Sequence, residues 1–217
     1  MKKPLKEKQY TRSESDKQIE ALKEQLSVFQ NKLDEKERII NELMITDNLT
    51  KLYNREYLAT VLEKEIARCQ RYAHPLAVIM IDIDGLRNFN ADHGTMAGDK
   101  MLSLTGNIIK ENIRKFDRPF RYGGEEFVVV LPETDMTMAY IVAERIRKNF
   151  ESVCKKEFAP GQNGSYTVST GITSVFAYTT NTIEIEELID QADNALARAK
   201  RKGGNISSRF EYVFPLS

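Results

Sequence analysis

The chain has 217 residues, and its 32 Lys and Arg balance 32 Asp and Glu, so the formal net charge is zero. A neutral chain argues against nucleic-acid binding through a broad basic surface. Hydrophobic residues, at 41%, are too frequent for a disordered chain. No apolar run reaches the roughly 18 residues that a membrane-spanning helix needs. Cys69 and Cys154 lack metal-ligand spacing, which favours buried thiols in a cytoplasmic protein over the alternative of a single disulfide.

The first part of the chain has the pattern of a coiled coil. Residues 1–18 are polar, and we expect a disordered tail there. Apolar residues then recur at steps of three and four, as in a heptad seam: Ile19, Leu22, Leu26, Phe29, Leu33, Ile40 and Leu43, with Lys36 at the one polar seam position. A single helix cannot hide such a seam, so residues 19–46 predict a parallel coiled-coil homodimer. The alternative is a helix that packs against its own domain.

The rest of the chain, residues 47–217, alternates between strand and helix patterns. Apolar residues at helical spacing predict helices at 55–73, 98–113, 136–150 and 183–202. Apolar and β-branched runs predict strands at 76–81, 166–176 and 210–214, and a hairpin at 120–131 that turns at Gly123 and Gly124. This alternation predicts an α/β fold with a central sheet flanked by helices.

Two acidic pairs are the candidates for chemistry. Asp82 and Asp84 end the buried strand at 76–81, and residues two apart share a face of a strand. Glu125 and Glu126 follow the glycine turn of the hairpin. If the two strands are neighbours, three or four carboxylates converge, and crowded carboxylates call for a cation such as Mg²⁺. The alternatives are a solvated strand end and a plain hairpin with exposed glutamates.

The hairpin sequence RYGGEEF, residues 121–127, resembles the signature of the GGDEF family of diguanylate cyclases in its Glu variant. Four further stretches resemble the family's motifs in order: 47–55, 82–99, 169–171 and 192–205. The resemblance covers about residues 46–210. It implies that two GTP molecules are condensed into cyclic di-GMP with release of two pyrophosphates. It also implies a mostly antiparallel sheet of βαββαβ type, similar to nucleotidyl cyclases and polymerase palms.

The resemblance also implies roles for individual residues. Asp82, the Ile83 carbonyl and Glu125 would hold Mg²⁺, or Mn²⁺ in its place, with Glu126 nearby. Glu125 would also help to deprotonate the attacking 3′-hydroxyl. The expected substrate-binding residues are Asn90 and Asp99 at the guanine edge, Arg87, Lys200 and the backbone of Gly85 and Leu86 at the phosphates, and Thr95 in the same segment.

Residues 114–117, RKFD, resemble the product-inhibition site of the same family. The resemblance implies that Arg114 and Asp117 bind cyclic di-GMP, with Arg145 on the following helix as a secondary contact. An Arg side chain can grip phosphate or stack on guanine, and Asp can accept hydrogen bonds from guanine. The alternative is an ordinary helix-end salt bridge between Arg114 and Asp117.

The sequence departs from the family pattern at several positions. Thr95 stands where His is usual, and Gly204 stands where Arg is usual, which removes an expected phosphate contact. No predicted metal ligand or guanine-reading residue is replaced, so the resemblance implies an active cyclase working as a homodimer. The alternatives are an inactive domain that acts as a receptor for GTP or cyclic di-GMP, and a relaxed cyclase that makes a mixed guanine–adenine product.

Overall fold

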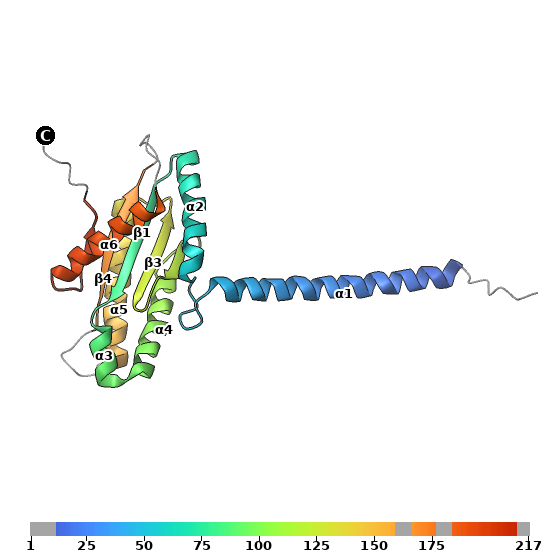
Figure 1. Cartoon of the computed structure of the whole chain (residues 1–217), viewed down its shortest axis with the longest axis horizontal. Helices are drawn as coiled ribbons and strands as arrows, with labels where there is room; N and C mark the ends of the chain where they lie inside the picture. Colours follow the sequence, from blue (N-terminus) through green and yellow to red (C-terminus); the bar gives the residue numbers. More distant parts are fainter. Residues whose placement is uncertain (1–11, 159–165, 177–183, 212–217) are drawn as a thin grey trace, which may run out of the picture. The chain divides into compact units, whose positions relative to one another are not determined.

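The computed structural model describes residues 12–158, 166–176 and 184–211, which divide into two compact units between residues 44 and 45. Helix α1 (Arg12–Ile45) makes up the described part of the first unit (Figure 1). It begins seven residues before Ile19, so the expectation of a disordered tail is wrong for residues 12–18. Residues 1–11 of that tail lie outside the described residues.

The apolar seam of α1 is uncovered in the single chain. The seam residues Leu22, Leu26 and Leu33 are 63%, 59% and 58% exposed. Exposed Leu side chains in a regular row are the surface that a second helix covers in a coiled coil. The helix is present as the heptad pattern predicts, and its dimerisation stays a prediction.

The second unit is built on a five-stranded sheet in the order β2-β3-β1-β4-β5. The strands are β1 (Leu76–Ile83), β2 (Arg118–Arg121), β3 (Glu126–Pro132), β4 (Val168–Val175) and β5 (Ser207–Arg209). All neighbours pair antiparallel except β4 and β5, which are parallel. The mostly antiparallel βαββαβ sheet is therefore confirmed.

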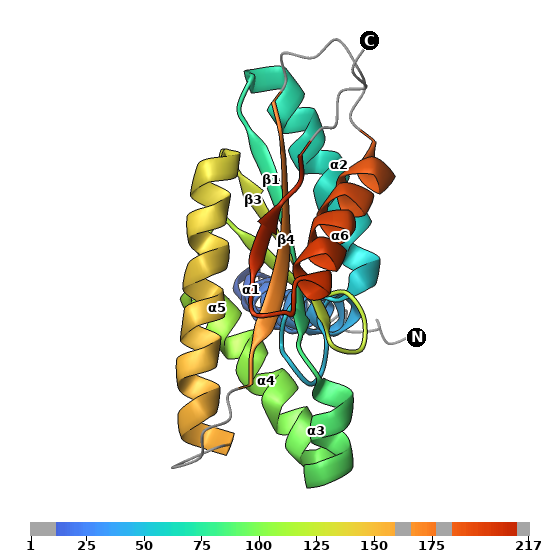
Figure 2. The ribbon, with the colours of Figure 1, turned by 90° about the vertical axis from the view of Figure 1, so that its left-hand side faces the viewer.

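Helices cover both faces of this sheet (Figure 2). Helices α2 (Arg55–Tyr72) and α6 (Ile185–Arg201) pack on one face. Helices α3 (Leu86–His93), α4 (Thr95–Glu111) and α5 (Met136–Phe158) pack on the other. Because β1 lies between these two layers, every one of its residues is buried, which explains its continuous apolar run.

Three predicted elements differ from the structure by three residues or more at one end. The helix predicted at 98–113 begins at Thr95 and is preceded by the separate helix α3, because Gly94, with φ 84°, breaks the helical path between them. Helix α5 continues to Phe158, beyond the predicted end at 150. The last strand lies at 207–209 instead of 210–214, because the Ile206 carbonyl already bonds the Thr170 amide of β4 at 2.9 Å. Residues 212–214 lie outside the described residues.

The expectation of buried thiols is confirmed. Cys69 and Cys154 are both free and buried, and burial raises the pKa of both thiols, that of Cys154 to about 12. No helix in the described part of the chain combines the length and the hydropathy that crossing a bilayer requires.

Candidate functional site

The acidic end of β1 and the tip of the β2–β3 hairpin lie side by side. The antiparallel register of β1 and β3 places Asp82 opposite Glu126. The Ile83 amide donates to the Glu125 carbonyl at 3.3 Å. The neighbouring strands that the sequence required for a shared acidic site are therefore confirmed.

The tip of the hairpin is fixed by Arg121. Its guanidinium donates to the Gly124 carbonyl at 2.9 Å and to the Asp47 carboxylate at 3.1 Å. Burial works to raise the pKa of Asp47, but hydrogen bonds from Thr50 and the charge of Arg121 outweigh it and lower that pKa below its ordinary value. The sequence motifs contained Asp47 and Arg121, but only the structure reveals that the two residues hold the glycine turn.

Asp82 is a buried carboxylate with one oxygen still unsatisfied. Lys200 Nζ contacts Asp82 Oδ2 at 2.5 Å, while Asp82 Oδ1 has no hydrogen-bond partner among the described residues. Burial raises the pKa of Asp82 to about 6; Lys200 opposes that rise, and the charges of Glu125 and Glu126 add to it. A buried polar atom without a partner is costly, so this oxygen is suited to a ligand that the protein binds.

Asp84 plays a different part from Asp82. Its carboxylate accepts hydrogen bonds from the Thr167 hydroxyl at 2.7 Å, the Ser169 hydroxyl at 2.7 Å and the Asn205 amide at 3.0 Å. The strand ends at Ile83, so the shared face that the two-residue spacing implied does not extend to Asp84. These donors occupy both oxygens of Asp84, which anchors the loop at 202–206 to the end of β1.

Glu125 and Glu126 add negative charge near Asp82, whereas Asp84 is bound by the fold, so the convergence of three carboxylates on a shared cation stays a prediction. The described residues include no group of three His, Cys, Asp or Glu side chains placed to hold a metal ion. In this structure Lys200 lies against Asp82. The donors still fit a hard divalent cation, because Asp82 keeps an unpartnered buried oxygen and the neighbouring groups offer oxygen atoms.

A pocket of about 320 Å³ opens beside these groups. Among its lining residues are Ile83, Gly85, Glu125 and Lys200. Gly85, with φ 73°, turns the chain from β1 into α3, so the backbone at the start of α3 is next to the pocket. The neighbouring Leu86 is buried, which leaves only its backbone for a ligand. Of the expected phosphate-binding residues, Gly85 and Lys200 line this pocket, whereas Leu86 and the exposed Arg87 do not.

A second pocket, of about 430 Å³, lies beside Asp99. Asn90 does not line this pocket; it lies against Gly98, the residue before Asp99, since a Cβ added to Gly98 would stand 1.8 Å from Asn90 Oδ1. Asn90 Oδ1 is buried and has no hydrogen-bond partner among the described residues. Leu49 and Ser103 also line the pocket, and the sequence had not singled them out for a binding role. Thr95 is exposed and lines neither pocket.

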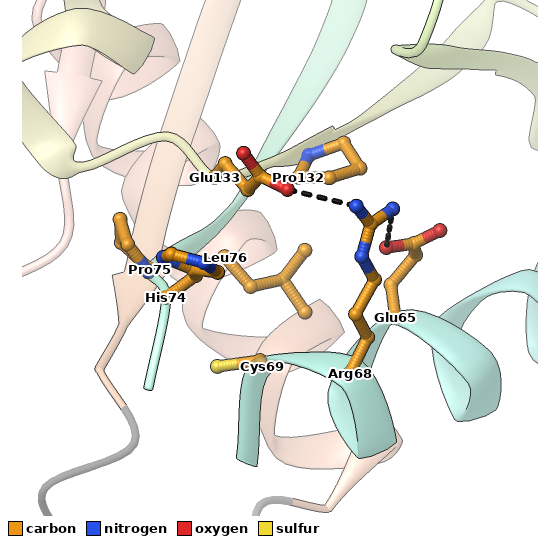
Figure 3. A pocket seen from close by; sticks show the side chains of 8 residues that line it. All are labelled: Glu65, Arg68, Cys69, His74, Pro75, Leu76, Pro132 and Glu133. Atoms are coloured by element: carbon orange, nitrogen blue, oxygen red, sulfur yellow. Dashed lines mark hydrogen bonds and ion pairs between the residues drawn. The ribbon is translucent and has the colours of Figure 1, made fainter. Parts of the chain in front are cut away.

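A third cavity, between α2 and the start of β1, is too small for a ligand (Figure 3). Its volume of about 10 Å³ is at the lower limit for one water molecule. Arg68 closes it by an ion pair with Glu133 at 2.8 Å, and the buried Cys69 lies in its wall. It is a packing feature of the fold.

The RKFD segment forms a compact turn between α4 and β2. The Arg114 amide donates to Asp117 Oδ2 at 2.7 Å, and the Asp117 amide donates back to the Arg114 carbonyl at 3.1 Å. The Asp117 carboxylate therefore bonds the backbone of Arg114. In the described part of the chain, the Arg114 and Asp117 side chains do not form the helix-end salt bridge that was the alternative. Burial raises the pKa of Asp117, against the lowering effect of its hydrogen bond and of the nearby charges of Arg114, Arg145 and Arg118. Arg145 Nε donates to the Asn112 carbonyl at 3.1 Å, which places it at the same turn.

Comparison with known proteins gives one consistent result. Residues 44–206 match the family model described as diguanylate cyclase, GGDEF domain. Diguanylate cyclase DosC of Escherichia coli is 38% identical over 159 residues, which are 73% of this chain and 34% of that protein. Diguanylate cyclase A of Treponema denticola is 35% identical over 167 residues, which are 76% of this chain and 44% of that protein. The chain thus spans about a third to under a half of the length of these two relatives.

Solved structures agree on the fold. The active GGEEF domain of a diguanylate cyclase from Vibrio cholerae is 30% identical, with a TM-score of 0.66 over 74% of this chain and 98% of that one. The coiled coil and GGDEF domain of DgcB from Caulobacter crescentus, solved with c-di-GMP, has a TM-score of 0.77 over 88% of this chain and 98% of that one. At 24% identity, the second likeness concerns the fold alone.

Proposed function

The chain belongs to the diguanylate cyclase, GGDEF domain family, and from that premise we propose that it condenses two GTP molecules into cyclic di-GMP and two pyrophosphates. The observation that carries the proposal is the pairing of Asp82 with the Glu125–Glu126 tip beside Lys200. The pocket beside these groups is suited to phosphates. The pocket beside Asp99 is suited to a base.

The phosphate end combines acidic and basic groups. A divalent cation, Mg²⁺ or alternatively Mn²⁺, held by Asp82, the Ile83 carbonyl and Glu125 with Glu126 nearby, would supply charge neutralisation for the α-phosphate and the attacking oxygen. Glu125 then accepts the proton of the 3′-hydroxyl. Lys200 and the backbone amides of Gly85 and Leu86 bind the phosphate oxygens, since an ammonium and N–H groups are donors only.

The base end selects guanine. A carboxylate at Asp99 can accept from guanine N1–H and N2–H₂ together, whereas adenine would present an acceptor at N1. The unpartnered Oδ1 of Asn90 supports a role in the same recognition, because a buried amide oxygen without a donor is costly and a bound guanine could supply one. Thr95 and Arg87 are both exposed, so no buried atom without a partner supports a binding role for either residue.

The direct test is to incubate the purified chain with Mg²⁺ and GTP, and then with GTP and ATP together. We expect cyclic di-GMP as the product in both mixtures. Absence of any product would favour the receptor alternative, for which the departures at Thr95 and Gly204 are the argument. A mixed guanine–adenine product would favour relaxed specificity and contradict the role of Asp99.

We propose that the reaction takes place across a homodimer joined through α1. Each domain offers one pair of pockets, and the two-fold product needs two GTP molecules facing each other. The exposed seam of α1 supports a dimer that keeps the partner at a high effective concentration. Replacing Leu26 and Leu33 by Asp should abolish activity at low protein concentration, while Asp at the off-seam positions Ser27 and Asn31 should leave it unchanged. If the variant with Asp at Leu26 and Leu33 is as active as the variant with Asp at Ser27 and Asn31, the proposal that activity needs the dimer is wrong.

We also propose that the turn at 114–117 binds cyclic di-GMP and inhibits the enzyme. The exposed Arg114 side chain, the buried Asp117 carboxylate and the nearby Arg145 support this role. Arg114→Ala should weaken product binding about tenfold or more, as expected for the loss of a charged hydrogen bond. The neighbouring exposed Lys115→Ala is the matched control. Isothermal titration with cyclic di-GMP measures both, and undiminished binding by Arg114→Ala would remove the proposal.

A further inference from the structure

The contact between Lys200 and Asp82 joins a fixed group to a movable one. Lys200 Nζ lies 2.5 Å from Asp82 Oδ2. The Asp82 side chain is 5% exposed, whereas the Lys200 side chain is 40% exposed. A lysine ammonium sits on a flexible four-carbon stem, so it can leave the carboxylate without any change of the backbone. Asp82 has no such freedom at the end of a central strand.

Helix α6 fixes the base of the Lys200 side chain. Ala192, Ala195 and Ala199 of this helix are fully buried. At Gly171 of β4, an added Cβ would stand 2.1 Å from the Ala192 carbonyl oxygen, so the helix backbone rests directly on the strand. The helix therefore cannot follow the ammonium, and any exchange of partners by Lys200 is a side-chain movement within the pocket that Lys200 lines.

We propose that Lys200 is an internal counter-ion of the cation site: it neutralises Asp82 in the nucleotide-free protein and moves to a phosphate when a divalent cation takes its place. This inference rests on the proposed function, from which the cation and the triphosphate are taken. The ammonium has three donors, but a divalent cation bound to Asp82 repels it, so Lys200 leaves Asp82 and bonds a phosphate. Lys200 thereby couples the two ligands, since a cation alone must break the ion pair, whereas a nucleotide offers the displaced ammonium a new partner.

The surroundings of Asp82 explain why a counter-ion is needed. Both oxygens of Asp84 are occupied by donors of the fold, and Glu125 and Glu126 add negative charge near Asp82. Without Lys200, Asp82 would be a buried charge with no cationic partner, which is strongly unfavourable. Removing the ammonium should therefore increase the attraction of the site for an added cation.

The experiment titrates Mn²⁺ alone into the full nucleotide-free chain and follows the free ion by electron paramagnetic resonance. Lys200→Met removes the charge but keeps the length of the stem, and it should bind Mn²⁺ about tenfold tighter than the unaltered chain, the equivalent of one charged hydrogen bond. Lys200→Arg keeps the charge and should not bind Mn²⁺ tighter. Lys202→Met removes the same charge from an exposed position two residues further on and should leave Mn²⁺ binding unchanged.

A second titration measures the coupling. With a non-hydrolysable GTP analogue present, the unaltered chain should gain Mn²⁺ affinity, and Lys200→Met should gain much less. Unchanged or weaker Mn²⁺ binding by Lys200→Met in the first titration would overturn the inference, as would an equal gain in Lys202→Met. These outcomes do not depend on product formation. If the unaltered chain makes cyclic di-GMP but Lys200→Met binds Mn²⁺ no tighter, the counter-ion role is wrong and the proposed cyclase function stands. Thermal unfolding of each variant confirms that it is folded.

Discussion

Two acidic clusters meet at the end of β1, and the fold treats their carboxylates in opposite ways. The site cluster consists of Asp82, Glu125, Glu126 and Lys200, and the support cluster consists of Asp84, Glu144, Arg147 and Asn205. In the site cluster, Asp82 keeps an oxygen without a hydrogen-bond partner among the described residues. In the support cluster, each of the two carboxylates bonds several donors.

The support cluster connects α5 to the loop that follows α6. Glu144 accepts hydrogen bonds from Arg147 at 2.8 and 2.9 Å and from the Ser207 hydroxyl at 2.7 Å. Arg147 also donates to the side-chain Oδ1 of Asn205 at 2.5 Å. The backbone N–H of Asn205 in turn donates to the Asp84 carboxylate. The result is a continuous chain of hydrogen bonds from α5 to the end of β1, which holds the loop whose Gly203 and Gly204 line the pocket beside Lys200.

The pKa values of the two clusters differ in direction. The hydrogen bond from Arg147 lowers the pKa of Glu144 to about 2, whereas burial raises the pKa of Asp82 to about 6. Where the fold stabilises the charged form, the carboxylate serves the structure. Where the fold leaves the charged form without enough partners, the carboxylate is suited to a ligand.

The largest expected effect comes from the site cluster. Asp82→Asn should reduce the rate of cyclic di-GMP formation by about 10²–10³-fold or more, since it removes a charge placed at the reacting phosphates. It should leave the melting temperature unchanged or higher, because a buried charge is removed. Initial rates and thermal unfolding measure the two effects. If Asp82→Asn keeps its activity within threefold of the unaltered chain, Asp82 does not serve a ligand and does not differ from the carboxylates of the support cluster.

Asp84→Ala should have the opposite profile and act mainly on stability. It removes a carboxylate that accepts three hydrogen bonds, and it should lower the free energy of unfolding by about 2–4 kcal/mol. The exposed Asp193→Ala in α6 is the control and should change it by less than about 0.5 kcal/mol. Urea unfolding compares them. A stable Asp84→Ala variant would show that the donors around Asp84 do not anchor the loop.

A smaller and pH-dependent effect is expected at Glu144. Its folded-state pKa of about 2 lies below the ordinary value of 4.5, so its contribution to stability is present above pH 4.5 and is lost as the pH falls toward 2. Glu144→Gln should therefore lower the free energy of unfolding by about 1–2 kcal/mol at pH 7. The difference from the unaltered chain should shrink as the solution is acidified. Melting curves at several pH values check this, and a difference that grows toward acid pH would contradict it.

The smallest effect is expected at the edge of the support cluster. Lys148 lies 3.8 Å from Glu144, and its side chain is 70% exposed. Solvent and salt screen such a pair, so Lys148→Gln should change the free energy of unfolding by less than about 0.5 kcal/mol. A larger loss, measured by urea unfolding, would mean that the cluster extends into its exposed rim.

The sequence could predict the neighbouring strands but not the different fates of their carboxylates. The apolar run before Asp82 and the glycine hairpin before Glu126 are local patterns, and the family motifs connect them. The donors that bind Asp84 come from Thr167, Ser169 and Asn205, which are 83, 85 and 121 positions further along the chain. No spacing rule links residues so far apart, so the residue pattern leaves Asp82 and Asp84 equivalent, and only the family resemblance gives a metal role to Asp82 alone.

Local backbone conformation explains the other differences. Gly94 separates α3 from α4, and the apolar spacing predicted the second of these helices but not the first. The last strand begins at Ser207 because the loop before it is held by Asp84 and Arg147. Both features depend on tertiary contacts that periodicity does not contain.

The central claim is that Asp82 is available to a cation whereas Asp84 belongs to the fold, and one measurement tests it most directly. Mn²⁺ is titrated, with a non-hydrolysable GTP analogue present, into the folded Asp82→Asn and Asp84→Asn variants. Saturable Mn²⁺ binding should be lost in Asp82→Asn and retained in Asp84→Asn. Retention by Asp82→Asn, or loss by Asp84→Asn alone, would contradict the account.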